Sequence, residues 1–151
     1  MASNTIQLDG NAGDFVLCEA NAAATVNPGN LVEITSVGTV QKHSVDSGDG
    51  ICQVAVEDAL QGNTIATAYT VGNKVIYHVM RPGTRFQGIV KAAVGGTAIA
   101  IGTQMISDGA GRFIAAADTG STVKKVMAIA EEAADLNDSG DVDTLVAMRA
   151  C

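Results

Sequence analysis

The second half of this 151-residue chain repeats the pattern of its first half. Three segments recur at an offset of 73 residues (102−29, 111−38 and 127−54), and a fourth recurs at 69 (143−74). The matched segments are 29–34 with 102–107, 38–40 with 111–113, 54–58 with 127–131, and 74–79 with 143–148. This shared order of glycines and alternating apolar residues predicts two copies of one β unit, residues 29–80 and 102–149, packed about a pseudo-twofold axis.

Short apolar runs separated by turn signals indicate strands along the whole chain. Residues 51–56 alternate with a period of two, as half-buried strands do, and residues 74–80 are the clearest strand, preceded by Gly72-Asn73 and ended by Arg81-Pro82-Gly83. The sequence Asn27-Pro28-Gly29-Asn30 is typical of a tight turn, because proline fixes φ and glycine accepts a positive φ. Roughly ten such strands, without strand–helix alternation, predict an all-β small barrel or sandwich forming one domain over residues 14–151.

The composition favours self-association. Hydrophobic residues make up 47% of the chain, yet aromatic residues make up only 3% and tryptophan is absent. An aliphatic side chain buries less apolar surface than an aromatic ring, so a single copy is expected to be modestly stable. Small β proteins of this kind often gain stability by assembling with closed rotational symmetry, and we therefore expect a homo-oligomer.

Charge and cysteine content exclude several classes of partner. Nine Lys and Arg against sixteen Asp and Glu give a net charge of −7, so no nucleic-acid partner is expected. No apolar run approaches the ~20 residues of a membrane span, and the first residues lack a signal-peptide pattern. We expect a protein that does not enter membranes and is made in the cytoplasm, with Cys18, Cys52 and Cys151 reduced.

Residues 1–13 are expected to form an extended N-terminal arm. Ile6 and Leu8 are its sizeable apolar side chains, and their spacing of two places them on one side of an extended segment. Such an arm cannot bury enough surface to order itself, but it could add a strand to the edge of a partner's sheet. Ile6, Leu8 and the nearby Phe15 are therefore the candidate residues for contact with a partner protein or another subunit. The alternative is a disordered tail without a binding role.

The chain carries one segment that is close to a metal-binding motif. Residues 135–143 have oxygen-bearing side chains at positions 1, 3, 5 and 9 of a calcium loop (Asp135, Asn137, Ser139 and Asp143), but the twelfth position is Val146 in place of a bidentate carboxylate. His43 and His78 lack a second ligand at metal-binding spacing, and two of the cysteines lie in strand-like runs. No catalytic motif is present. We therefore expect no catalytic residues, no metal and no cofactor.

Five segments, taken together, carry a family resemblance. They are residues 28–32 (PGNLV), 52–59 (CQVAVEDA), 71–75 (VGNKV), 98–103 (AIAIGT) and the Asp108-Gly109 hairpin. Their rhythm resembles that of the head decoration, or capsid cement, proteins of tailed bacteriophages, and the likeness covers most of residues 14–149. The chain departs from the family at Gln53, where glycine is usual, and in the acidic stretch 131–143, which has no clear counterpart.

The resemblance implies a structural protein of the virion. It implies a homotrimer on the outer surface of an icosahedral phage head, bridging capsomers and contacting the major capsid protein, so that several weak contacts act together. The alternative is an oligomeric β-barrel binding module for a ligand or receptor that is not tied to a capsid. A sugar-binding module normally displays aromatic platforms, and only Tyr69 and Tyr77 are available for that purpose.

Overall fold

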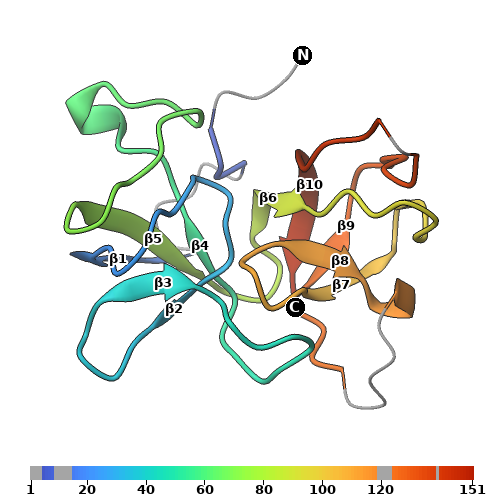
Figure 1. The fold of residues 1–151 in the computed structure, drawn as a ribbon, viewed down its shortest axis with the longest axis horizontal. Coiled ribbons are helices and arrows are strands. Elements are labelled where there is room, and N and C mark those ends of the chain that lie inside the picture. Colours follow the sequence, from blue (N-terminus) through green and yellow to red (C-terminus); the bar gives the residue numbers. More distant parts are fainter. Residues whose placement is uncertain (1–4, 9–14, 119–123, 139) are drawn as a thin grey trace.

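The computed structural model describes residues 5–8, 15–118, 124–138 and 140–151. Within these residues the regular structure is β, apart from two single turns of 3-10 helix, η1 (Ala59–Gln61) and η2 (Ala116–Asp118). The strands are β1 (Phe15–Asn21), β2 (Val32–Ile34), β3 (Val40–Lys42), β4 (Gln53–Ala55), β5 (Lys74–Met80), β6 (Arg85–Val90), β7 (Gln104–Ser107), β8 (Phe113–Ala115), β9 (Ala128–Ala130) and β10 (Thr144–Ala150). The fold is all-β, as predicted, and its strands form two bodies that lie side by side (Figure 1).

The second half of the chain forms a closed five-stranded barrel with the strand order β10-β6-β8-β7-β9. The pairing of β9 with β10 closes the ring. Every pair is antiparallel except β6–β8, which is joined in parallel through Val90 and Phe113. We call this unit, residues 85–150, barrel 2.

The first half contains a three-stranded sheet, β1-β5-β4, and a two-stranded hairpin, β2-β3. Two single bridges join these pieces. Leu31, next to β2, bridges Val54 of β4, and Ala22, next to β1, bridges Val40 of β3. With these bridges the strands follow the cyclic order β1-β5-β4-β2-β3, and the Ala22–Val40 bridge is parallel, like the β6–β8 pair of barrel 2. The two halves therefore share one strand order. We call residues 15–80 barrel 1.

Strand pairing identifies the equivalent residues of the two barrels. The hairpins β2–β3 and β7–β8 have the same register at an offset of 73, because the pair Val32–Lys42 corresponds to Met105–Ala115 (105−32 and 115−42). The equivalence also includes β1 and β6, which lie outside the ranges 29–80 and 102–149.

The outer strands depart from the alignment that the sequence suggests. The Leu31–Val54 bridge corresponds to the Gln104–Ile129 pair, so β4 and β9 are offset by 75 residues (129−54) and not by 73. Strand alternation has a period of two, so a shift of two residues leaves the same side chains facing inward and the sequence cannot detect it. The remaining offsets are 71 for β5 and β10 (149−78) and 68 for β1 and β6 (86−18).

Equivalent positions line the interior of the two barrels. The ring of Tyr69 fills barrel 1 at the position of Ala134 in barrel 2, whereas Phe113 fills barrel 2 at the position of Val40. The aromatic side chains therefore occupy non-equivalent positions in the two barrels, which weakens the repeat in the sequence. The interior of barrel 1 consists of Ala22, Val26, Val32, Val40, Ala55, Tyr69, Val75 and Tyr77, and that of barrel 2 of Val90, Ile99, Met105, Phe113, Ala130, Ala134, Val146 and Met148.

The barrels meet at the turn 27–30 of barrel 1. The Gly29 N–H donates to the Ala55 carbonyl within barrel 1 (2.8 Å), and the Gly29 carbonyl accepts the Ile89 N–H of barrel 2 (2.9 Å). The Leu31 N–H donates to the Gly111 carbonyl on the β7–β8 turn (2.9 Å). The apolar cluster that fills barrel 2 continues through Leu31 into barrel 1, so the two barrels share a core.

This joint occurs once in the chain. A pseudo-twofold axis would repeat it, with turn 100–103 of barrel 2 placed against β1 of barrel 1. Instead Ile101, the equivalent of the buried Pro28, is 73% exposed, and nothing lies within 4 Å of the position that a Cβ would take at Gly102. The predicted pseudo-twofold axis is therefore wrong. A sequence repeat identifies equivalent units, but it does not specify which faces they bring together.

Gly29 and Gly102 form a matched pair for testing the joint. Both adopt positive φ, +88° and +91°, so alanine costs about 1 kcal/mol of backbone strain at either position. A Cβ at Gly29 would lie 2.5 Å from Leu145 Cδ2, which adds overpacking of about 1–3 kcal/mol. We expect Gly29→Ala to lower the free energy of unfolding by about 2–4 kcal/mol and Gly102→Ala by about 1 kcal/mol in urea denaturation. Equal losses would contradict this joint.

Candidate functional site

The structure places part of the predicted arm inside the protein. Residues 5–8 lie antiparallel to β6, where Gln7 bridges Phe86, the Leu8 N–H donates to the Arg85 carbonyl (3.1 Å), and the Ile6 carbonyl accepts the Gln87 N–H. The Ile6 side chain is 0% exposed and belongs to the core cluster. For residues 5–8 the prediction of an arm without contacts in its own chain is therefore wrong. The open edge of β6, far away in sequence, supplies the hydrogen bonds that local reasoning could not foresee.

The three predicted contact residues thus have different positions. Ile6 is a core residue, so its side chain is not presented to a partner. Leu8 is half-buried, and its role in contact with a capsid or subunit stays a prediction. The Phe15 backbone begins β1, paired with Met80, but its side chain and residues 1–4 and 9–14 lie outside the described part of the chain.

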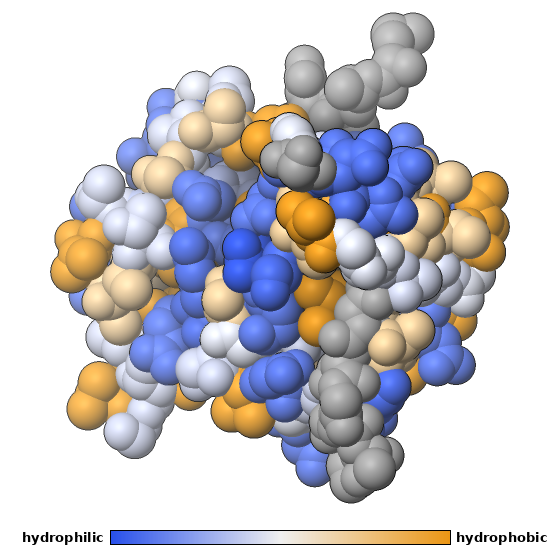
Figure 2. Space-filling view, turned by 45° about the vertical axis from the view of Figure 1, so that its right-hand side comes forward, coloured by the Kyte–Doolittle hydropathy of each residue, from blue (hydrophilic) through white to orange (hydrophobic). Residues whose placement is uncertain are grey.

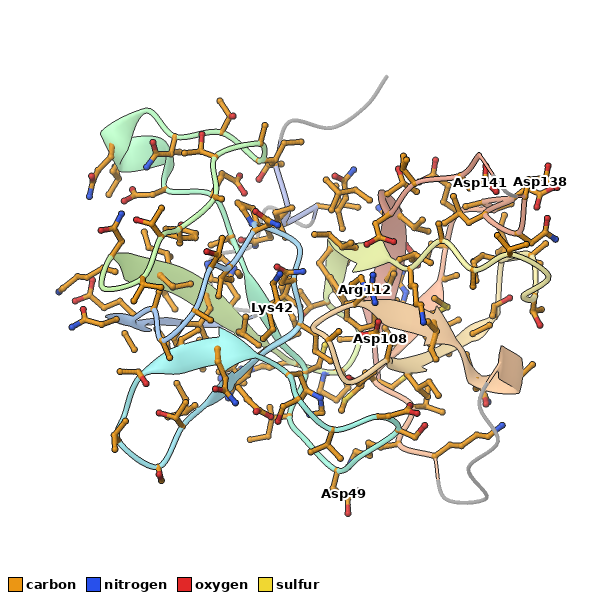
Figure 3. The ribbon with its side chains drawn as sticks, viewed as in Figure 1. Lys42, Asp49, Asp108, Arg112, Asp138 and Asp141 are labelled. Carbon is orange, nitrogen blue, oxygen red and sulfur yellow. The ribbon has the colours of Figure 1, made fainter. Side chains whose placement is uncertain are left out.

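A cleft of about 480 Å³ opens between the two barrels. Figure 3 shows Lys42 on one side of it and Arg112 with Asp108 on the other, and Figure 2 shows hydrophilic residues across the middle of the visible face. Both barrels contribute to its walls, so the cleft depends on the joint. Its lining comprises Asn27, Pro28, Asn30, Lys42, Ile65 and Ala66 from barrel 1, and Ile89, Ala110, Arg112, Asp143, Thr144 and Leu145 from barrel 2.

Arg112 is the central charge of this cleft. Its Nε and Nη2 donate to the Asp108 carboxylate (2.7 Å each), and its Nη1 donates to Asp143 (2.9 Å). Burial raises the pKa of Asp143, but hydrogen bonds from Arg112 and from the Ala92 N–H outweigh that effect and hold the pKa below its ordinary value. Two carboxylates therefore neutralise the guanidinium, so Arg112 is not available as a simple anion site.

Lys42 is the cationic side chain on the barrel 1 side of this cleft. Within the described residues Lys42 has no ion-pair partner, and it lines the cleft together with Asn27 and with Asn30, whose amide already donates to the Gly111 carbonyl and accepts the Asn27 N–H. The described residues that line the cleft include no Cys, Ser or His. Sequence reasoning missed this site, because residues far apart in the chain meet there only through the joint between the barrels.

The calcium-like segment forms a turn. The Asp138 N–H donates to the Asp141 carboxylate (2.7 Å), and Figure 3 shows these two residues together, apart from Arg112. Asp143, the ninth residue of the motif, turns away to bond Arg112. Among the residues that the structure describes, no group of three or more His, Cys, Asp or Glu is placed to hold a metal ion.

His43 and Ser107 form a buried hydrogen bond between the barrels. His43 Nδ1 lies 2.8 Å from Ser107 Oγ, and a Glu33 carboxylate oxygen lies 3.9 Å from His43 Nε2. These are the residue types of an acid–His–Ser hydrolase site. The Glu33–His43 distance is too long for a hydrogen bond, and Ser107 is fully buried and also accepts the Gly109 N–H. The cluster therefore secures the joint, since no substrate can reach the hydroxyl.

The other titratable groups singled out in the sequence are unreactive or exposed. Burial lowers the pKa of His78 to about 4, so the ring is neutral at physiological pH. Burial raises the pKa of the Cys52 thiol to about 12, which leaves little thiolate for nucleophilic attack. Cys18 lies on β1 and Cys151 is exposed, and all three cysteines are free.

Helix is confined to two single 3-10 turns in the part of the chain that the structure describes, and no helix there has the length and apolarity to cross a bilayer.

These features define a class of protein: an all-β chain of two five-stranded barrels with one strand order, joined at turn 27–30 and through contacts of residues 43–47 with residues 107–111. Such a fold is similar to the crystal structure of the head fiber gp8.5 N base in bacteriophage phi29, with a TM-score of 0.55 and 15% sequence identity. The likeness covers 91% of this chain and 94% of that chain. At this identity it establishes the fold. No family model and no curated protein matches the sequence.

Replacing Ile6 tests whether residues 5–8 belong to the folded core. We expect Ile6→Ala to lower the free energy of unfolding by about 2–4 kcal/mol, because it leaves a cavity among fully buried neighbours. The half-buried Leu8 is a matched control, and Leu8→Ala should cost less than about 1 kcal/mol. Chemical denaturation measures both values. A negligible effect of Ile6→Ala would show that the arm does not contribute to the fold.

Asp143 gives the cleft a defined pH dependence. Its folded-state pKa lies below the ordinary value, so its ion pair stabilises the fold above about pH 4 and this contribution is lost as the pH falls through the folded-state pKa. We expect Asp143→Asn to cost less than about 1 kcal/mol at neutral pH, because the pair is solvent-accessible, and to cost nothing in strong acid. The exposed Asp49→Asn is the control. A difference between wild type and Asp143→Asn that does not change with pH would contradict the ion pair.

Proposed function

We propose that this chain is a structural protein of a phage head and has no enzymatic activity. The observation that carries the proposal is the likeness of nearly the whole chain to the base of a phage head fibre. The chemistry of the described residues agrees with it. The guanidinium in the cleft is paired, the Ser107 hydroxyl is buried, and the Cys52 thiol is protonated at neutral pH.

We propose further that the protein sits on the outer surface of an icosahedral head, as a homotrimer that bridges capsomers and contacts the major capsid protein. Three copies acting together turn individually weak contacts into a stable attachment. The net charge of −7 keeps decorated particles apart in solution and away from other polyanions. The protein would then belong to the virion after synthesis in the host cytoplasm, and Leu8 and Phe15 remain its proposed contact residues.

A second candidate function is an oligomeric binding module for a ligand or receptor, independent of a capsid. The cleft between the barrels favours it, because the ammonium group of Lys42 and the side chain of Asn27 line its wall. A small polar ligand, or a polar side chain of a receptor, fits the chemistry of this lining.

Co-sedimentation separates the two functions. Heads of the phage that encodes the chain, prepared without this protein, are mixed with increasing amounts of it and pelleted. We expect saturable binding at a fixed ratio to the capsid lattice, unchanged by Lys42→Ala. A protein that stays in the supernatant at every concentration would contradict the structural role. Pelleting with host cells that is lost in Lys42→Ala would support the binding module.

A further inference from the structure

The joint between the barrels has a donor side and a receiving side. The donor is turn 27–30 of barrel 1, and the receiving side is the outer edge of β6 together with the β7–β8 turn 108–112 of barrel 2. The Ile89 N–H on β6 donates to Gly29, and the Gly111 carbonyl on the turn accepts the Leu31 N–H. The two barrels share one fold. Barrel 2 therefore also has a turn equivalent to the donor, and barrel 1 also has a strand edge and hairpin turn equivalent to the receiving side.

Barrel 2 carries an unused donor turn. Turn 100–103 is the equivalent of turn 27–30, and Gly102 has nearly the same φ as Gly29, +91° against +88°. The Gly102 N–H donates to the Ala130 carbonyl (2.8 Å), as the Gly29 N–H donates to Ala55. The turn thus has the conformation of the docked one, but Ile101 at its tip is exposed to solvent.

Barrel 1 carries an unused receiving side at the outer edge of β1. The Ala23 N–H donates to the Val40 carbonyl as the Lys91 N–H donates to Phe113, so the two edges begin alike. The Ala22 N–H donates to the Asn73 carbonyl beside β5. Successive N–H groups of a strand point to opposite sides, so the Asn21 N–H points away from β5, as the Ile89 N–H points away from β10. Among the described residues no backbone carbonyl accepts it.

The β2–β3 turn completes this receiving side. Gly38 is the equivalent of Gly111, and nothing lies within 4 Å of the position that a Cβ would take there. Its neighbour Val37 is 81% exposed. In Figure 1 β1 lies at the left of the molecule and the chain leading into β7 lies at the right, so the unused donor and the unused receiving side lie toward opposite ends of the molecule.

We propose that a second copy of this chain completes the pattern, with turn 100–103 of one copy docking on the β1 edge and the β2–β3 turn of the next. In this contact the Gly102 carbonyl accepts the Asn21 N–H, as the Gly29 carbonyl accepts the Ile89 N–H inside the chain. The Gln104 N–H donates to the Gly38 carbonyl, as the Leu31 N–H donates to the Gly111 carbonyl. The inference deepens the self-association in the proposed function and names its surface. The contact is heterologous, so it closes into a ring or continues as a filament.

The receiving side for the second copy is more polar than the internal one. Asn21 stands where barrel 2 has Ile89 (89−68), and Lys74 stands where it has Leu145 (145−71). Less apolar surface is buried in this contact, so we expect it to be weaker than the internal joint and to depend on protein concentration.

Sedimentation velocity of single and mixed variants tests this contact. Wild type should form species larger than one 15.3 kDa chain as its concentration rises. Ile101→Asp disables the donor, Asn21→Pro removes the receiving N–H, and each should weaken association at least tenfold. Because each variant keeps the side that the other lacks, an equimolar mixture should form a pair of twice the chain mass. Only a heterologous contact predicts this rescue.

Two controls keep the result interpretable. Leu60, 98% exposed on η1, lies outside both sides, so Leu60→Asp should associate like wild type. Gly38→Asn also blocks the receiving side, and its positive φ tolerates asparagine, so it replaces Asn21→Pro if proline disturbs the strand. Wild type that stays monomeric, variants that still assemble, or a mixture that stays monomeric would each overturn the contact. Head binding is scored separately, so a failure there does not affect this result.

Discussion

Gly29 is the residue on which the arrangement of this molecule depends. Its N–H donates to the Ala55 carbonyl of barrel 1 and its carbonyl accepts the Ile89 N–H of barrel 2, so a single residue is hydrogen-bonded to both barrels. It can do so because its φ is +88° and because Leu145 and Ile89 leave no room for a side chain. This close approach brings the two barrels together beside the cleft and the shared apolar cluster, and the hydrogen bonds of Leu31 and His43 to the β7–β8 hairpin reinforce it.

The sequence predicted the strands and their repetition better than it predicted their assembly. Glycine positions and period-two alternation indicated an all-β chain, which the structure confirms. They could not distinguish registers two residues apart, and they led to a twofold axis that the exposed Ile101 excludes. The sequence also placed Ile6 in an arm without a partner in its own chain. The edge of β6 that pairs with this segment lies about eighty residues away in the chain, and the segment alone carries no sign of it.

The candidate site was hidden for a related reason. Arg112 and Asp143 belong to different segments, and Lys42 belongs to the other barrel, so no motif connects them. The acidic stretch that did attract attention supplies Asp143 to this cleft in place of a metal site. Hydrogen-bond partners of this kind are decided by folding, whereas a motif search considers only spacing along the chain. Sequence reasoning therefore singled out the acidic stretch and set aside a calcium site there, but it did not foresee the ion pair of Asp143 with Arg112.

The position of β6 has a mechanical consequence. Residues 5–8 lie along one edge of β6 and β10 lies along the other, and both run antiparallel to it. A pull that enters at residue 5 and leaves at residue 150 acts on opposite ends of two strands that point the same way. The hydrogen bonds across β6, roughly perpendicular to the strands, then bear the load together in shear, because none can open before its neighbours. Tension along the chain would be carried by barrel 2, leaving barrel 1 unloaded.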